Sequence, residues 1–412
     1  MPHVKPSRKL RREIGLFLLL FYGLGNILGA GIYVLIGDIV KISGYYAPVS
    51  FLIACIVVLF TALSYAELSA RFPQSAGEAL YIWEGFGSRW LSRVVGLTIA
   101  LGGMLSTATI VTGFYDYFSL FFTLPKEIVI FVILTLLVLI AVWGIKESVT
   151  IAAILTFVEI FGLLMVIYVG VEHTSHFPDV SQIVPPVDAG VINAILLGAF
   201  LAFYAFLGFE DIVNIAEEVK TPAKTMPRAI LLALVVATLL YVGVAFVTIL
   251  VIPPDEMHQS SALLAQVYEK ATGEKATILS MIGMLAVING ALVQIIMASR
   301  IFYGMAANGW LFRFLAKVNP VTHTPIAATI MTGIVIFLLT LWLPLLTLAQ
   351  YTSFLTFLIF TVVNGALIRI KLQKRGRNNI KNDIKMVPLW IPVIAIVLNL
   401  IMLTVQIMDI VK

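Results

Sequence analysis

The sequence predicts an all-α polytopic membrane protein with eleven transmembrane helices. Of its 412 residues 60% are hydrophobic and only 12% are charged, and the mean hydropathy is +1.03. The apolar residues form long runs, and the basic residues are concentrated between alternate runs. Water-soluble domains have about 45–50% apolar and about 25% charged residues, so this composition excludes an ordinary soluble protein.

The long apolar runs are predicted to be helices that cross a bilayer. A crossing helix needs about 20 predominantly apolar residues, and these runs lack the strict alternation of a membrane β-barrel. Helices also pair all of their own backbone amides, which lipid requires. The predicted spans are 14–37, 46–70, 89–122, 126–145, 149–171, 190–216, 227–252, 277–307, 323–345, 347–370 and 387–411.

The distribution of Lys and Arg predicts the orientation. Cytoplasmic segments of membrane proteins carry an excess of these residues. With the N-terminus in the cytoplasm, all but five of the 27 basic residues fall on the cytoplasmic side; the exceptions are Lys41, Lys126, Lys270, Lys275 and Lys412. We therefore expect a multi-pass protein of the cytoplasmic (plasma) membrane with its C-terminus outside. The segments flanking the spans are a basic tail at 1–13, an extracellular linker at 172–189 and a basic cytoplasmic loop at 371–386.

Several classes of function are excluded by residue type. The single Cys allows no intrachain disulfide and no thiolate cluster, and no two of the five His residues have a ligand spacing, so no metal site is predicted. The spans contain no Ser/His/Asp set and no Gly-x-Ser-x-Gly motif, so we expect neither an enzyme nor a cofactor. The net charge of +5 is explained by topology, and nucleic acid is not an expected partner.

The first span is rich in glycine, with Gly25, Gly29 and Gly31 at its centre. Glycine weakens a helix by about 0.5–1 kcal/mol relative to alanine, so the helix can unwind here and present free amides to a substrate carboxylate. The alternative is close helix packing, because Gly25 and Gly29 have the Gly-x-x-x-Gly spacing. The sequence allows both interpretations, and the fold we predict contains a broken first span.

The sixth span contains Gly208 followed by two carboxylates, Glu210 and Asp211. An acid at the centre of a membrane helix costs about 2.5–3.5 kcal/mol on insertion scales, and such residues usually face a site or a pathway. Alternatively, both side chains could reach water at the cytoplasmic end. Irregular helices five spans apart are typical of an inverted repeat. We therefore predict repeats at 14–171 and 190–370 with broken helices 1 and 6, plus one extra helix at 387–412.

At these residues the sequence resembles the amino acid, polyamine and organocation transporter superfamily, whose members share the five-plus-five inverted-repeat fold. The similar stretches are 25–32, 64–68, 73–77, 206–210, 216–222, 226–230, 297–300 and 318–325. The resemblance covers most of the chain. One departure is that typical members have twelve spans, whereas eleven are predicted here.

The resemblance implies a substrate site between spans 1 and 6. Backbone amides of Gly29, Ala30 and Gly31 would bind the substrate carboxylate, and the Ile27 carbonyl would accept from its amino group. Tyr204 would gate the pocket. The expected substrate-binding residues are Asn26, Ile27, Gly29, Ala30, Gly31, Phe203, Tyr204, Leu207 and Glu210.

Glu159 is the candidate for ion coupling. Many proton-coupled relatives carry a Lys midway along span 5, and this position is Glu159 here. Eleven residues into its span, it should lie about 15 Å deep, where desolvation favours the neutral acid and suits a proton carrier. The alternatives are a sodium ligand and a structural acid hydrogen-bonded between helices.

The predicted function is secondary active transport of amino acids or related small organic amines by alternating access, with H⁺ as the expected coupling ion and Na⁺ as the alternative. Two further functions remain open. One is a substrate–substrate exchanger without ion coupling, and the other is a membrane ligand sensor without flux. In each case the partners are a small-molecule substrate and the lipid bilayer.

Overall fold

The computed structural model describes residues 10–118, 122–173, 184–254, 263–342, 346–373 and 386–411. Most of the predicted N-terminal tail, of the 172–189 linker and of the 371–386 loop lies outside these ranges. Within them the regular structure is helical, and the single β-bridge joins Ile14 to Val219. The predicted all-α polytopic architecture is confirmed.

Each predicted span corresponds to a helix. In chain order they are α1 (Leu16–Ser43), α2 (Ala47–Arg71), α4 (Arg89–Phe118), α5 (Lys126–Trp143), α6 (Ile145–Glu172), α8 (Ala189–Ala205) with η2 (Glu210–Glu218), α9 (Pro222–Val251), α11 (Thr277–Ala307), α12 (Ile326–Trp342), α13 (Leu346–Leu372) and α14 (Trp390–Val411). Among the described residues nine segments are long and apolar enough to cross a membrane, and α12 and α14 are shorter apolar helices. The count of eleven crossings stays a prediction.

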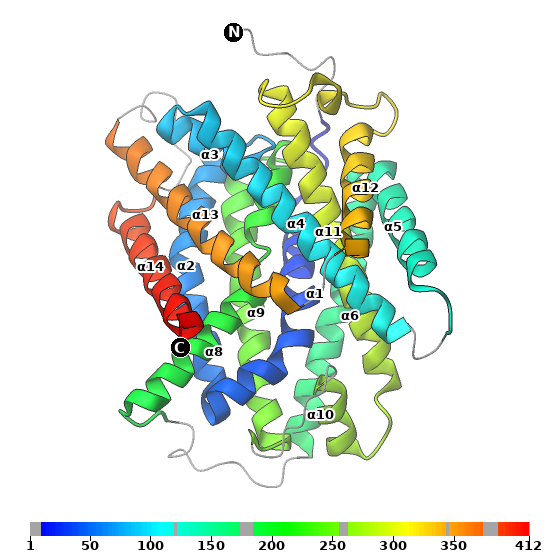
Figure 1. The fold of residues 1–412 in the computed structure, drawn as a ribbon, viewed down its shortest axis with the longest axis vertical. Helices are drawn as coiled ribbons and strands as arrows, with labels where there is room; N and C mark the ends of the chain where they lie inside the picture. The colour runs from blue at the N-terminus through cyan, green and yellow to red at the C-terminus, as the bar shows by residue number, and fades with distance from the viewer. Residues whose placement is uncertain are drawn as a thin grey trace.

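Two short helices lie at opposite ends of the bundle (Figure 1). The first, α3 (Gly77–Phe86), lies at the end where α1 begins, and the second, α10 (Leu263–Thr272), lies at the other. We call these the α3 end and the α10 end. Short 3₁₀ segments, η1 (Gly44–Tyr46) and η4 (Arg313–Ala316), complete the described helices.

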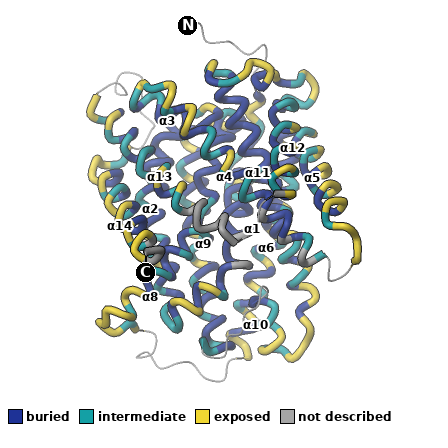
Figure 2. Tube along the Cα trace, viewed as in Figure 1, coloured by how far each residue is buried: buried dark blue, intermediate teal, exposed yellow. Residues whose placement is uncertain are grey.

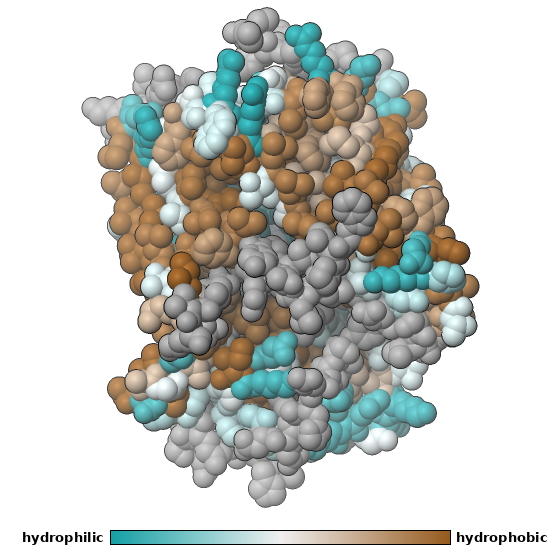
Figure 3. Space-filling view, in the orientation of Figure 1, coloured by the Kyte–Doolittle hydropathy of each residue, from teal (hydrophilic) through white to brown (hydrophobic). Residues whose placement is uncertain are grey.

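The interior and the surface of the bundle are both apolar. Figure 2 shows buried residues at the centre and exposed ones along the outer helices and the loops. Large apolar side chains such as Phe131, Leu139 and Phe157 are exposed on the outer helices. Hydrophobic residues cover much of the middle of the visible face, and hydrophilic residues gather toward its two ends (Figure 3). Water would disfavour such a continuous apolar surface, whereas lipid accommodates it.

Helices pack against their counterparts five spans later in the chain. The contacts pair α1 with α8, α2 with α9, α4 with α11, and α5 with α12. In an inverted repeat, counterpart helices near the pseudo-twofold axis touch one another. The inverted repeat at 14–171 and 190–370 stays a prediction.

The predicted break in span 6 is confirmed. Helix α8 ends at Ala205, residues 206–209 form turns, and the chain continues as the 3₁₀ helix η2. Gly208 has φ of +125°, a conformation that side-chain-bearing L-residues rarely adopt. Glycine at this position lets the chain leave the α-helix.

The predicted break in span 1 is wrong, because α1 is helical from Leu16 to Ser43. Its glycines serve close packing. A Cβ atom on Gly29 would lie 2.8 Å from the carbonyl oxygen of Ala286, and one on Gly31 would lie 2.5 Å from Cα of Ala205. The packing interpretation of these glycines is therefore the correct one in this conformation.

Buried charges join segments at the α3 end. Arg300 of α11 lies 3.3 Å from Glu218 of η2, and both side chains are fully buried. Just before α1, the amide of Ile14 donates to the Glu218 carbonyl at 3.1 Å. Together these contacts attach the start of α1 to η2 and α11.

Candidate substrate-binding site

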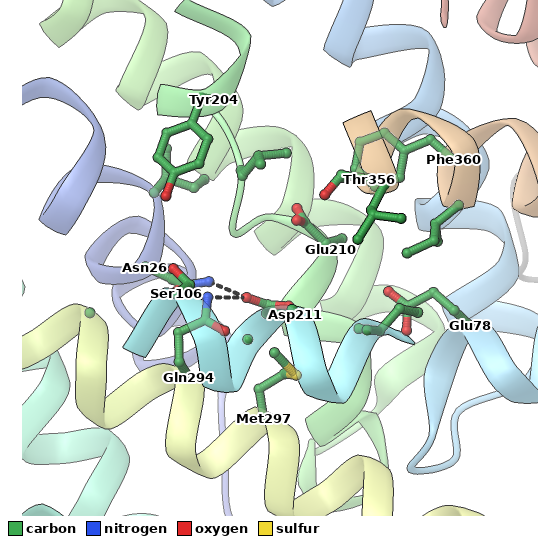
Figure 4. A pocket seen from close by; sticks show the side chains of 18 of the residues that line it. Asn26, Glu78, Ser106, Tyr204, Glu210, Asp211, Gln294, Met297, Thr356 and Phe360 are labelled. Carbon is green, nitrogen blue, oxygen red and sulfur yellow. Dashed lines mark hydrogen bonds between the residues drawn. The ribbon is translucent and has the colours of Figure 1, made fainter. Parts of the chain in front are cut away.

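A cavity of about 80 Å³ lies beside the break in span 6, between α1, α2, α3, α4, α8, η2, α11 and α13 (Figure 4). One buried water needs about 10–15 Å³, so this space exceeds the needs of a single water several-fold. Part of the wall is apolar, including Ile27, Ile99, Met297 and Phe360. The polar side chains of the wall include a hydrogen-bonded network and a set of carboxyls.

The first polar group on the wall is a network of Asn26, Asp211 and Gln294. The Asn26 amide donates to Asp211 Oδ2 at 2.5 Å, and the Gln294 amide donates to the same oxygen at 2.8 Å (Figure 4). Gln294 also donates to Asn26 Oδ1 at 3.1 Å, while its own Oε1 has no hydrogen-bond partner within the described residues. The network joins α1, η2 and α11 at the cavity.

The turn at Gly208 makes this network possible. The Asn26 amide also donates to the Gly208 carbonyl at 3.2 Å, and the Gly208 amide donates to Glu210 Oε2 at 2.8 Å. A Cβ atom on Gly208 would lie 2.7 Å from Asn26 Nδ2. Gly208 therefore brings the break in span 6 into contact with α1.

The second polar group is a set of carboxyls. Glu78, Glu210 and Asp211 line the cavity, and none of the described lining residues is basic. Glu78 lies in the short helix α3, where burial, together with the nearby charge of Asp211, raises its pKa to about 8. A cavity with this lining favours positive charge, either protons on the acids or a cationic ligand group.

A separate polar cluster surrounds Glu159 of α6, which is fully buried. Asn289 of α11 donates to Glu159 Oε1 at 2.8 Å and to Thr156 Oγ1 at 2.9 Å. Tyr33 of α1 donates to the backbone carbonyl of Glu159 at 3.0 Å. The second carboxyl oxygen, Oε2, has no hydrogen-bond partner among the residues that the structure describes.

Tyr241 of α9 joins α1 to the end of α8. Its hydroxyl lies 2.6 Å from the Ile27 carbonyl oxygen and 2.8 Å from the Ala205 carbonyl oxygen, and these two acceptors share its single proton. In this conformation Ile27 therefore accepts from Tyr241 at the position where the resemblance placed the substrate amino group.

Most of the predicted substrate residues lie on the cavity wall. These are Asn26, Ile27, Gly31, Tyr204, Leu207 and Glu210. Phe203 lies outside the wall and stacks on Phe357 with 3.7 Å between the ring centroids. Gly29 packs against α11 at Ala286. Ala30 lies within α1, and its side chain is outside the described part of the structure.

Sequence reasoning omitted four residues from the predicted site: Asp211, Gln294, Glu78 and Tyr241. Asp211 carries the same signal as Glu210, since both are charges within an apolar span. Gln294 is an amide in a membrane helix, which is equally typical of helix packing. Tyr241 carries no signal, because a Tyr in an apolar run does not reveal which carbonyls its hydroxyl meets.

Comparisons with known proteins identify the family of this chain. A family model described as amino acid permease matches residues 14–412. The branched-chain amino acid permease BcaP of Bacillus subtilis is 30% identical over 394 residues, which cover 89% of this chain and 82% of that protein. The chain belongs to the amino acid permease family. The resemblance to the transporter superfamily is thereby confirmed, and the protein is a membrane transporter rather than an enzyme.

The relatives of this permease have different substrates in their names. The vacuolar cationic amino acid transporter 4 of Arabidopsis thaliana is 29% identical over 381 residues, or 86% of this chain and 62% of that protein. The methylthioribose transporter of B. subtilis is 27% identical over 389 residues, or 89% of this chain and 82% of that protein. The chain thus spans less than two thirds of the Arabidopsis relative.

Proposed function

We propose that the protein is a secondary active transporter that moves amino acids across the cytoplasmic membrane by alternating access, with proton coupling. The observation that carries the proposal is the cavity beside the break in span 6, with a buried carboxyl–amide network on its wall. A transporter needs such a site in the middle of its spans, formed by an interrupted helix.

Asp211 and Gln294 form the binding site for the substrate ammonium group in this proposal. Both line the cavity, and Gln294 Oε1 is a buried acceptor without a partner in the described ranges. Hydrogen bonds between a charged group and buried acceptors contribute about 1.5–3 kcal/mol each. An ammonium group can supply the donor that Gln294 Oε1 lacks, and its positive charge can balance the negative charge of Asp211.

The substrate carboxylate is proposed to bind the amides of Gly29, Ala30 and Gly31. These amides lie inside the continuous helix α1 in this conformation, so a turn of α1 has to open for them to bind an anion. Opening also releases the Ile27 carbonyl from Tyr241. The substrate-bound state therefore differs from the present one at the centre of α1.

Glu159 is the proposed proton carrier. Its carboxyl is buried and accepts a hydrogen bond from Asn289 at Oε1, while Oε2 has no partner among the described residues. Burial disfavours the charged form unless a cation or several donors surround it. The neutral acid fits these surroundings, and loss of its proton requires water to reach Oε2. Na⁺ is less well supported, because the cluster's unpartnered oxygens, Glu159 Oε2 and Asn289 Oδ1, are few for a cation shell.

Protonation of Glu159 can influence the cavity through α1. Thr156 donates to the Phe21 carbonyl at 3.0 Å, and Tyr33 donates to the Glu159 backbone. These two contacts hold α1 on either side of the segment that carries Asn26 and Ile27. Asn289 donates both to the Glu159 carboxyl and to the Thr156 hydroxyl, so a change of charge at Glu159 reaches the contact between Thr156 and α1 through this amide.

The orientation of the protein follows the distribution of basic residues. We place the N-terminus and the α3 end in the cytoplasm, and the C-terminus outside. The Arg300–Glu218 ion pair and the attachment of Ile14 to Glu218 then lie on the cytoplasmic side of the cavity. They are candidates for the contacts that open when substrate leaves toward the cell interior.

Counterflow in proteoliposomes tests the transport activity itself. Vesicles containing the purified protein are loaded with one unlabelled amino acid and diluted into a trace of the labelled one. A transporter concentrates the label inside transiently, whether or not an ion is coupled. The experiment is repeated with a panel of amino acids. If none of them accumulates, the protein is a sensor without flux, and the proposal is contradicted.

A further inference from the structure

Glu78 lies in an unusual place for a charged residue. It is the second residue of α3, a helix of 10 residues at the end of the bundle, yet its side chain lines the central cavity (Figure 4). The first turn of α3 is packed tightly on η2, because a Cβ atom on Gly77 would lie 2.5 Å from Val213 Cγ2. This contact directs Glu78 toward the cavity.

The Glu78 carboxyl has few hydrogen-bond donors to stabilise a negative charge. Asn214 of η2 donates to Oε2 at 3.2 Å, and Oε1 has no hydrogen-bond partner among the described residues. The residue is only 1% exposed. A buried carboxyl with so few donors needs a proton or a cation beside it.

The titratable groups that face Glu78 are all acidic. They are Tyr65 of α2, Tyr81 of α3, and Glu210 and Asp211 of η2. The lining residues contributed by α4 and α13 include no charged side chain. No basic residue of the described wall can therefore neutralise Glu78, and a ligand can supply the missing positive charge.

We propose that Glu78 binds a second positive charge on the substrate, so that the cavity selects amino acids with a cationic side chain. This inference rests on the proposed function, because it takes the substrate ammonium group to bind at Asp211. Figure 4 shows Glu78 and Asp211 at separate positions on the wall, with Met297 and Phe360 nearby. The apolar side chains suit the methylene chain that links the two charges of such a substrate.

The arrangement assigns a role to two of the three acids that line the cavity. Asp211, with Gln294, receives the α-ammonium group, and Glu78 receives the side-chain cation. The third acid, Glu210, accepts from the Gly208 amide at the break in span 6. An uncharged apolar side chain would leave Glu78 without a partner. The cavity therefore distinguishes lysine from an uncharged analogue of the same length by one charge pair.

The test compares lysine with norleucine, which lacks only the side-chain amine. Dissociation constants are measured on the purified protein by isothermal titration for the parent, Glu78→Gln and Glu78→Asp. The control is Glu127→Gln, which removes an exposed charge at the start of α5, outside the cavity lining. We expect the parent and the control to bind lysine about tenfold or more tightly than norleucine.

In Glu78→Gln the affinities for lysine and norleucine should become equal. In Glu78→Asp part of the preference for lysine should remain. A purely structural role of the side chain would not produce this difference between the two variants. An unchanged ratio in Glu78→Gln overturns the inference. Equal affinities of the parent for lysine and norleucine also overturn it while leaving amino acid binding intact. Absence of binding by either amino acid, or by any in a wider panel, overturns the proposed function as well. If Glu78→Gln fails to fold, the parent ratio and Glu78→Asp still decide the question.

Discussion

The side-chain amide of Asn26 donates a 2.5 Å hydrogen bond to the carboxylate of Asp211, joining α1 to the interrupted half of span 6. Gln294 donates to the same oxygen from α11. Three segments far apart in the sequence thus meet at one carboxylate on the cavity wall. Any movement of α1 relative to η2 has to break or rebuild this contact, so it is a sensitive position for both binding and transport.

Asp211→Asn should weaken substrate binding. The variant keeps the size of the side chain and removes the negative charge that we assign to the ammonium group. Since a hydrogen bond to a charged group contributes about 1.5–3 kcal/mol, affinity should fall by a factor of about 10 to 100. Isothermal titration of the purified protein measures this change. Asp38→Asn, at an exposed position in α1, is the matched control; equal affinities of the two variants would remove Asp211 from the site.

Gly31→Val should destabilise the folded protein. Its Cβ atom would overlap the backbone of Ala205, and overpacking of this kind typically costs about 1–3 kcal/mol. Thermal unfolding in detergent should show a clear decrease in Tm. Gly15→Ala is the control, because nothing lies within 4 Å of the Cβ position there. If Gly31→Val unfolds at the parent temperature, the close packing of α1 on α8 is not what requires this glycine.

Glu218→Gln should destabilise the α3 end. Arg300 would then be a buried charge with no anionic partner, and breaking a buried ion pair on one side costs about 3–5 kcal/mol. The unfolding temperature should fall, and the double variant Glu218→Gln with Arg300→Met should recover part of the loss. No recovery in the double variant would show that the unpaired charge is not the cause.

The stability of the ligand-free protein should depend on Glu78 and on pH. The pKa of Glu78 is about 8 in the folded protein and near 4.5 in the unfolded chain. Between these two pH values the folded protein therefore keeps a proton on Glu78 that the unfolded chain has lost. Its contribution is fully present below about pH 4.5 and is lost as the pH rises through about 8. Thermal unfolding from about pH 6 to about pH 9 should therefore show a steeper loss of stability for the parent than for Glu78→Gln. Parallel curves would contradict the raised pKa.

Much of the fold is predictable from the sequence because lipid imposes simple rules on it. Apolar runs of sufficient length must be helices, and the charged residues at Glu210 and Asp211 beside Gly208 indicate an interruption. Glycine composition cannot decide the state of span 1, because the same small residue permits both unwinding and close packing. The contacts at Gly29 and Gly31, made by distant segments, decide it for this conformation.

The site is less predictable than the fold. Asn26, Tyr204 and Leu207 could be placed from the resemblance, and the structure brings them to one cavity. The carbonyl contacts of Tyr241 and the reach of Glu78 into the cavity depend on how helices cross, which no local pattern encodes. Long-range hydrogen bonds of this kind are visible only in three dimensions.

Uptake driven by a pH gradient, in vesicles containing the parent or Glu159→Gln, tests the central claim most directly. An inside-alkaline gradient should drive accumulation of labelled substrate by the parent without Na⁺. Because Gln cannot release a proton, Glu159→Gln should lose this accumulation and keep counterflow, with Glu147→Gln at the start of α6 as the control. The same pH-driven accumulation by the parent and by Glu159→Gln would contradict the account.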